Sequence, residues 1–170
     1  MTLRIAGFTA FALFSTTAAA EVKFATPDGF LVERQYHTSA SAEKAWALLG
    51  HPEKYWPKEH TWSGDPANLS LKMAAGGCFC ERWKGGEAEH GRVVMARTNE
   101  LLRINGAFGP MQDMAVTGVV SVALKAAEAG TDITVSYRVS GTAAHQLDKL
   151  APVVDSVVGV QFGNWVDKTR

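Results

Sequence analysis

Alternating apolar and polar positions dominate the chain from Leu69 to Ser140 and predict a series of β-strands. In the clearest, Asp132–Ser140, every second residue is apolar, and Thr134, Ser136 and Arg138 fall between them. Short turn signals separate the strands, so neighbours are expected to pair antiparallel. Together with one earlier strand, the strands predicted are Phe30–Thr38, Leu69–Met73, Cys78–Trp83, Ala88–Ala96, Leu101–Ala107, Met114–Lys125 and Asp132–Ser140.

Other segments have the period of an amphipathic helix. Ser39–Leu49 begins with a helix-capping signal and is followed by Gly50, a residue type that commonly ends helices. Pro52–Trp56 predicts a second short helix. A long C-terminal helix is expected from Pro152 onward, because apolar or amide side chains recur at helical spacing at Val154, Val157, Val158, Gln161 and Trp165.

This order of elements predicts an α+β fold. Glu21–Gly29 is expected to be a loose lead-in, followed by one strand, the two short helices, the remaining strands and the long helix. One antiparallel sheet and one long amphipathic helix bury their apolar faces against each other most simply when the sheet curves around the helix. We therefore expect a helix-grip arrangement of about six or seven strands, with a cleft for a small molecule between the two layers.

The first twenty residues have the layout of a secretory signal peptide. Arg4 precedes the apolar run Ile5–Phe14, and Ala18–Ala20 provides a small-residue cleavage site before Glu21. A run of ten residues is too short to span a bilayer, which needs about 20. We expect an exported protein, periplasmic or secreted and without stable membrane insertion, in which residues 21–170 form a single domain.

Charge and motifs exclude several functions. Lys and Arg total 17, and Asp and Glu total 17, so the chain lacks the basic excess of a dedicated nucleic-acid binder. It has no glycine-rich loop before a helix and no GxSxG element. No cofactor is therefore expected, and no catalytic residue is assigned by motif.

Six segments in this order resemble the START-like (SRPBCC, polyketide cyclase/dehydrase-like) superfamily. Within it, the chain is most similar to the bacterial homologues of the activator of the heat-shock-ninety ATPase. The segments that carry the resemblance are Ser39–Leu49, Gly76–Glu81, Glu89–Val94, Leu101–Pro110, Gly130–Val139 and Leu150–Gln161. The resemblance implies a cavity for apolar or amphipathic molecules between sheet and helix. The superfamily shares no catalytic motif, and members of this branch are mostly cytosolic, so the expected export is a departure.

Cys78 and Cys80 are the sharpest chemical feature of the sequence. Residues two apart in a strand point to the same face, with Cα atoms about 6.5–7 Å apart. That separation is close to the limit for a disulfide. Three interpretations remain open: two buried apolar fillers, a strained disulfide, or a pair of thiolates for a soft metal ion.

Glu81 and His90 flank the glycine pair of a predicted hairpin turn. If the turn is centred between Gly85 and Gly86, these two residues face each other directly. A carboxylate beside an imidazole can act as a general acid–base pair, or can be a structural cross-strand contact. Phe79, Glu81, Trp83 and His90 would then share one face of the hairpin, opposite the two cysteines.

The leading hypothesis is an exported helix-grip protein that binds a small apolar or amphipathic molecule without obligatory catalysis. One alternative is a cyclase- or hydratase-type enzyme that uses Glu81 and His90. Another is a metal or redox role for Cys78 and Cys80. The binding residues expected are Phe79, Glu81, Trp83, His90, Val154, Val157, Val158, Gln161 and Trp165.

Overall fold

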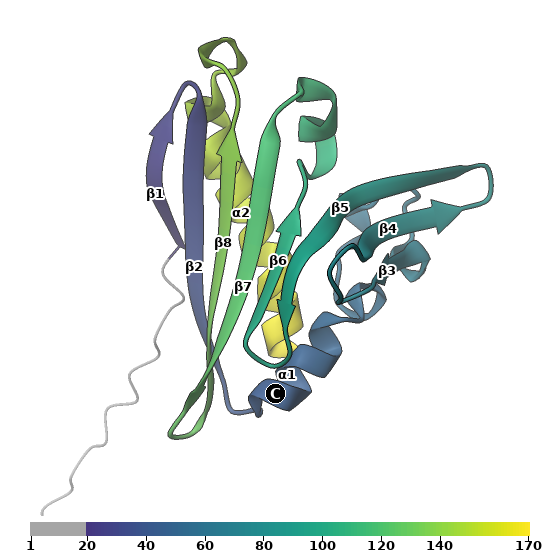
Figure 1. Cartoon of the computed structure of the whole chain (residues 1–170), viewed down its shortest axis with the longest axis vertical. Coiled ribbons are helices and arrows are strands. Elements are labelled where there is room, and N and C mark those ends of the chain that lie inside the picture. The colour runs from purple at the N-terminus through teal and green to yellow at the C-terminus, as the bar shows by residue number, and fades with distance from the viewer. Residues whose placement is uncertain (1–19) are drawn as a thin grey trace, which may run out of the picture.

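The computed structural model describes residues 20–170, in which a curved antiparallel sheet packs against one long helix (Figure 1). The sheet has eight strands in the order β1-β2-β8-β7-β6-β5-β4-β3. Their bounds are β1 Ala20–Thr26, β2 Gly29–Thr38, β3 Leu69–Leu71, β4 Cys78–Trp83, β5 Gly86–Arg97, β6 Leu101–Asn105, β7 Thr117–Ala127 and β8 Gly130–Ser140. The expected signal peptide lies outside the described residues, apart from Ala20.

The helices lie between β2 and β3 and after β8. Helix α1 (Ala42–Leu49) begins where the Ser41 hydroxyl accepts the Lys44 N–H, and Gly50 caps its end. Helix α2 (Leu147–Asp167) is the long C-terminal helix. The shorter turns are 3₁₀ helices: η1 Pro52–Lys54, η2 Lys58–His60, η3 Pro66–Asn68, η4 Gly109–Met114 and η5 Ala143–His145. The predicted α+β helix-grip architecture is confirmed.

Two details of the prediction are wrong. Glu21–Gly29 is not a loose lead-in, because Ala20–Thr26 pairs with β2 as an edge strand and raises the number of strands to eight. Its pattern is weak because Phe24 is 39% exposed. Helix α2 begins at Leu147 rather than near Pro152, which lies inside the helix. Leu147 and Ala151 are fully buried, and this burial outweighs the backbone hydrogen bond that the proline removes.

The core lies between α2 and the concave face of β2, β7 and β8. On β8 the predicted apolar face is buried, with Ile133, Val135, Tyr137 and Val139 each at most 1% exposed. Trp165 on α2 is also fully buried, and its indole N–H donates to the Ala45 carbonyl, so it ties α2 to α1.

A bidentate ion pair fixes α2 on the sheet. Arg34 of β2 donates to both carboxylate oxygens of Asp155, at 3.0 and 2.8 Å. Gly159 leaves room for it, since a Cβ at that position would lie 2.4 Å from the Arg34 guanidinium. The ion pair therefore needs a helix residue without a side chain beside it.

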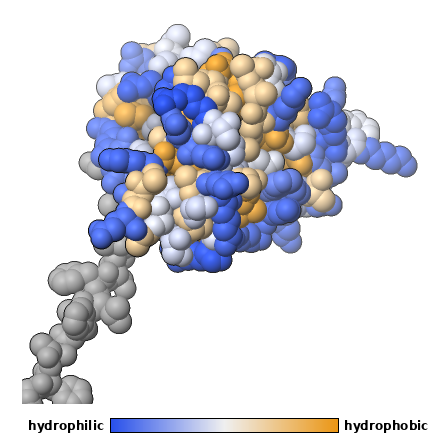
Figure 2. All heavy atoms as spheres, turned by 60° about the horizontal axis from the view of Figure 1, so that its bottom comes forward, coloured by the Kyte–Doolittle hydropathy of each residue, from blue (hydrophilic) through white to orange (hydrophobic). Residues whose placement is uncertain are grey.

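The end of the sheet formed by β5, β4 and β3 lies away from the Arg34–Asp155 ion pair. There, the β4–β5 hairpin reaches out beyond the other strands (Figure 1). On the face in Figure 2, hydrophilic side chains surround small apolar patches. Among the described residues, no helix is long and apolar enough to cross a membrane.

Candidate functional site

The register of the β4–β5 hairpin differs from the predicted one. Trp83 pairs with Gly86 and Glu81 pairs with Ala88, so the turn is centred one residue earlier than expected. The predicted direct pairing of Glu81 with His90 is therefore wrong. Either glycine of the pair can supply the backbone freedom that a tight turn needs, and the sequence pattern did not distinguish the two centres.

A β-bulge nevertheless brings the two side chains together. Phe79 pairs with Gly91 and Cys80 with Glu89, which leaves His90 as an extra residue on β5. Bulges of this kind redirect a side chain at the edge of a ladder. His90 Nε2 lies 3.0 Å from the Glu81 carboxylate, so the predicted contact exists although its register was wrong.

The Glu81 carboxylate is fully buried and fully engaged. One oxygen accepts the Ser63 backbone N–H at 2.6 Å, and the other accepts the Trp62 N–H at 3.0 Å and faces His90. Backbone donors of this kind stabilise an ionised carboxylate strongly. These two amides were missed by sequence reasoning, because a backbone N–H leaves no signal in the residue pattern.

Burial and hydrogen bonding set the protonation of the pair. Burial alone would raise the pKa of Glu81, but hydrogen bonds from Ser63, Trp62 and His90 hold it below its usual value. Burial lowers the pKa of His90, and Glu81 opposes this shift only in part. Near neutral pH the carboxylate is therefore ionised, and a neutral His90 donates its Nε2–H to it. The imidazole Nδ1 is then the proton acceptor of the pair.

An aromatic chain runs from the sheet to α2 beside this pair. Seven rings contact in series, with centroids 5.1 to 6.3 Å apart. His90 lies against one of them, Phe79, at 5.0 Å. In order, the aromatic chain is Phe30, Tyr137, Phe108, Phe79, Trp56, Phe162 and Trp165.

The predicted binding residues of α2 lie at two depths. Val158 and Trp165 are buried in the core, whereas Val154 and Val157 are half-buried. Gln161 is only 5% exposed, and its amide makes no hydrogen bond to any residue in the range 20–170. Its amide atoms are not among the buried polar atoms that lack a partner, so they still reach solvent.

Trp83 does not join this group. It ends β4 at the tip of the hairpin, where its indole lies so close to Gly86 that a Cβ there would come within 2.5 Å. The tip points away from α2 (Figure 1). The physical reason is the length of the hairpin, which extends past the region that α2 covers.

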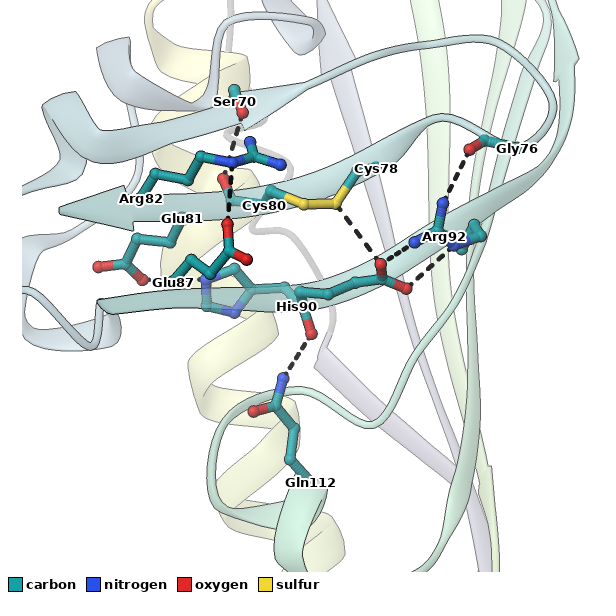
Figure 3. Close-up of a disulfide and its surroundings, with 11 residues drawn as sticks. Ser70, Gly76, Cys78, Cys80, Glu81, Arg82, Glu87, His90, Arg92 and Gln112 are labelled. Carbon is teal, nitrogen blue, oxygen red and sulfur yellow. Dashed lines mark hydrogen bonds and ion pairs between the residues drawn. A yellow bond between two sulfur atoms is a disulfide. The ribbon is translucent and has the colours of Figure 1, made fainter. Parts of the chain in front are cut away.

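Cys78 and Cys80 form a disulfide on the other face of β4 (Figure 3). The interpretation as two buried thiol fillers is therefore wrong. Their Cα atoms are 5.4 Å apart, closer than in a fully extended strand, which brings the sulfurs within bonding reach. Cys80 is buried, whereas Cys78 is half-buried.

Among the described residues, the group that could ligate a metal ion consists of these two cysteines and Glu89. The sulfur atoms of Cys78 and Cys80 and a carboxylate oxygen of Glu89 all lie within 4.8 Å of one another. Arg92 forms a bidentate ion pair with Glu89. Joined as a disulfide, the two sulfurs lack the thiolate charge that a soft metal ion requires. Reduction would be needed before they could act as ligands.

A pocket of about 410 Å³ lies beside the disulfide. It is lined by Gly50, His51, Glu53, residues 69–72, Cys78 and Arg82. Sequence reasoning missed it, because it forms only where β3 pairs with β4 and the end of α1 comes close to both.

Comparison with known proteins supports the fold. No family model matches the chain, and no curated protein matches it. Among solved structures, an uncharacterised protein from Rhizobium leguminosarum has a TM-score of 0.61 at 13% identity, covering 91% of this chain and 98% of its own. MLL2253 from Mesorhizobium loti has a TM-score of 0.58 at 19% identity, covering 81% and 94%. CalU16 from Micromonospora echinospora has a TM-score of 0.51 at 11% identity, covering 88% and 85%.

Identities this low show the fold alone. The chain has a helix-grip fold, similar to the fold of these proteins. Similarity of fold does not carry over an activity, so function has to be argued from the sites described above.

Proposed function

We propose that the protein binds a small apolar or amphipathic molecule between the curved sheet and α2. The observation that carries this proposal is Gln161, whose side chain is only 5% exposed and makes no hydrogen bond within residues 20–170, while its amide atoms still reach solvent. An amide that stays accessible on an otherwise apolar helix face is placed to hydrogen-bond a bound molecule.

The surroundings of Gln161 favour an apolar ligand body. Val154 and Val157 lie on the same flank of α2 and are half-buried. Farther from Gln161, at the end of the sheet where α2 begins, η4 (Figure 1) carries the buried Met111 and the half-buried Met114. Methionine side chains adapt to differently shaped apolar ligands.

Native mass spectrometry of gently purified protein tests for the natural ligand. We expect an organic mass bound one to one and lost on denaturation. Binding of the neutral fluorophore N-phenyl-1-naphthylamine locates the site. Val154→Trp should abolish binding by filling the space, whereas Val153→Trp, on the 62% exposed side of the same helix, should leave it unchanged. Equal binding by both variants, or by neither, would contradict the proposal.

Export is proposed from the N-terminal layout of Arg4, Ile5–Phe14 and Ala18–Ala20. The Cys78–Cys80 disulfide supports it, because disulfides persist mainly in oxidising compartments. The intact mass of the protein recovered from a periplasmic fraction should begin at Glu21. The ordered motifs also support placement near the bacterial homologues of the activator of the heat-shock-ninety ATPase, but an exported protein would not meet that cytosolic partner.

Acid–base catalysis by Glu81 and His90 is a second candidate, favoured by their buried 3.0 Å contact. With the carboxylate fully engaged, His90 Nδ1 would accept the proton and Glu81 would orient the ring. The bound molecule recovered from the wild type should then differ chemically from that recovered from His90→Gln. Identical bound masses from both proteins would leave binding as the function.

A further inference from the structure

The Cys78–Cys80 disulfide contributes little to the fold. Both cysteines lie on β4, so the bond joins no two elements of the structure. Their sequence separation is 2, and the stabilisation expected from a disulfide falls with the length of the loop that it closes. A chemical role therefore accounts for this bond better than a structural one.

The disulfide is reachable from the adjoining pocket. Cys78 lines the pocket of about 410 Å³ and is half-buried, whereas Cys80 is only 5% exposed. A small molecule in the pocket therefore reaches the sulfur of Cys78 first, with Cys80 behind it as the leaving group. Accessible sulfur is the first requirement for thiol–disulfide exchange.

The pocket favours a negatively charged occupant. Lys72 lines it, and its ammonium group forms no ion pair with any residue in the described part of the chain. Arg82 also lines it and makes an exposed 3.3 Å ion pair with Glu87. The acidic residue in the lining, Glu53, lies 3.0 Å from His51. In the lining of the pocket, two cations, Lys72 and Arg82, therefore face one carboxylate, Glu53, whereas Glu89 and Arg92 beside the disulfide offset each other.

We propose that Cys78–Cys80 is a redox-active disulfide that reacts with a small, negatively charged thiol held in the pocket by Lys72 and Arg82. This activity goes beyond ligand binding at α2, because it uses the opposite face of β4. The occupant belongs to the class of low-molecular-weight thiols that carry a carboxylate or sulfonate group.

The exchange takes place in two steps. The thiolate attacks Sγ of Cys78, a mixed disulfide forms, and the electron pair of the broken bond leaves on Sγ of Cys80, which takes up a proton. A second thiolate attacks the sulfur of the bound molecule and releases Cys78, which is protonated in turn. Two thiols become one small disulfide, and the protein gains two electrons and two protons.

Glu89 is placed to assist the reverse reaction. Its carboxylate lies 3.8 Å from Sγ of Cys78 and is held by Arg92. In the reduced protein it can accept the proton of the Cys78 thiol and so generate the attacking thiolate. Arg92 offsets the repulsion between the carboxylate and an approaching anion.

The test compares three thiols of similar size and different charge: 2-mercaptoethanesulfonate, 2-mercaptoethanol and cysteamine. Protein thiols released over time are alkylated and counted by mass, and rates are corrected for the thiolate fraction of each reagent. We expect the sulfonate to react about five-fold faster than the neutral thiol, and cysteamine to be slowest. The sulfonate advantage should shrink as salt is added.

Variants assign the charge preference to the pocket. Lys72→Ala with Arg82→Ala should abolish the preference, whereas Lys84→Ala, at the exposed hairpin turn outside the pocket, should keep it. Equal corrected rates for all three thiols would overturn the proposal. So would protein from an oxidising compartment that carries two free thiols, or one bound zinc ion at Cys78, Cys80 and Glu89 in place of the disulfide.

Discussion

Arg34 and Asp155 form an ion pair between β2 and α2, whereas Glu81 and His90 form a polar pair within one hairpin. The first pair joins residues 121 positions apart, and the second joins residues nine apart. The first joins a regular strand to a regular helix and fixes α2 on the sheet. The second depends on a β-bulge and lies behind a disulfide.

The comparison separates long-range contacts that hold the fold together from local contacts that form a site within one hairpin. Contacts across α2, β2 and β8 stabilise the whole molecule, so changes there should affect global stability. The hairpin holds its polar groups through local backbone geometry and two loop amides, so changes there should act on chemistry more than on the fold.

The largest effect should come from the α2 side. Trp165→Ala removes a fully buried indole and its hydrogen bond to the Ala45 carbonyl. We expect the free energy of unfolding, measured by urea denaturation, to fall by about 3–5 kcal/mol. Trp62→Ala, at a position 50% exposed, is the matched control and should cost less than about 1 kcal/mol. Similar costs for both would contradict this division of the molecule.

The ion pair should come next. Asp155→Ala leaves the Arg34 guanidinium against α2 without its partner, and we expect a loss of about 3 kcal/mol. Glu100→Ala breaks an exposed ion pair with Arg97 and should cost less than about 1 kcal/mol. Chemical denaturation of both variants measures the contrast. A loss for Asp155→Ala no larger than for Glu100→Ala would show that the ion pair does not hold the helix.

Removal of the disulfide should cost less than either. Replacing both Cys78 and Cys80 by serine opens a loop of minimal length, so we expect a loss on the order of 1–2 kcal/mol. Thermal and urea unfolding of the oxidised protein and the double variant provide the measurement. A loss of unfolding free energy as large as that of Trp165→Ala would show that the disulfide holds the fold together as the α2 contacts do.

The smallest effect should be a change in pH dependence. Because burial lowers the pKa of His90, the unfolded chain binds a proton below about pH 6.5 that the folded chain does not. Stability therefore falls as the pH drops from 7.5 to 5.5, and His90 contributes at most about 1.4 kcal/mol to that fall. His90→Gln should remove this contribution, whereas exposed His51→Gln should not. If the stability of His90→Gln and that of the wild type changed with pH in the same way, this prediction would be wrong.

Glu81 titrates in a lower pH range. Its pKa is lowered in the folded protein, so its stabilisation is present above the unfolded value of about 4.3 and is lost as the pH falls through the folded value. The two residues therefore destabilise the protein in sequence on acidification, with His90 acting first.

The regular parts of the fold could be predicted from the sequence, and the irregular parts could not. The alternation in β8 identified its buried face because apolar residues at every second position of a strand, such as Ile133, Val135 and Val139, point to the same side. β1 escaped prediction because an edge strand buries few side chains. Burial of Leu147 decides the start of α2, and no local pattern reveals that burial.

The sequence indicated which residues form the candidate site, but not the backbone geometry that brings them together. The contact between Glu81 and His90 was predicted from a register that is wrong, and the bulge and the Trp62 and Ser63 amides that complete their surroundings depend on tertiary structure. The pocket beside Cys78 likewise depends on how β3 and α1 meet.

The strand order also constrains when the chain can fold. β2 lies between β1 and β8, and its residue Phe30 pairs with Val139. The N-terminal hairpin of β1 and β2 thus pairs with β8, which is synthesised more than a hundred residues later. Local contacts alone therefore cannot complete the sheet. During synthesis, the chain therefore remains without the pairing of β2 with β8 until β8 has been made, and the sheet closes only once nearly the whole chain is available.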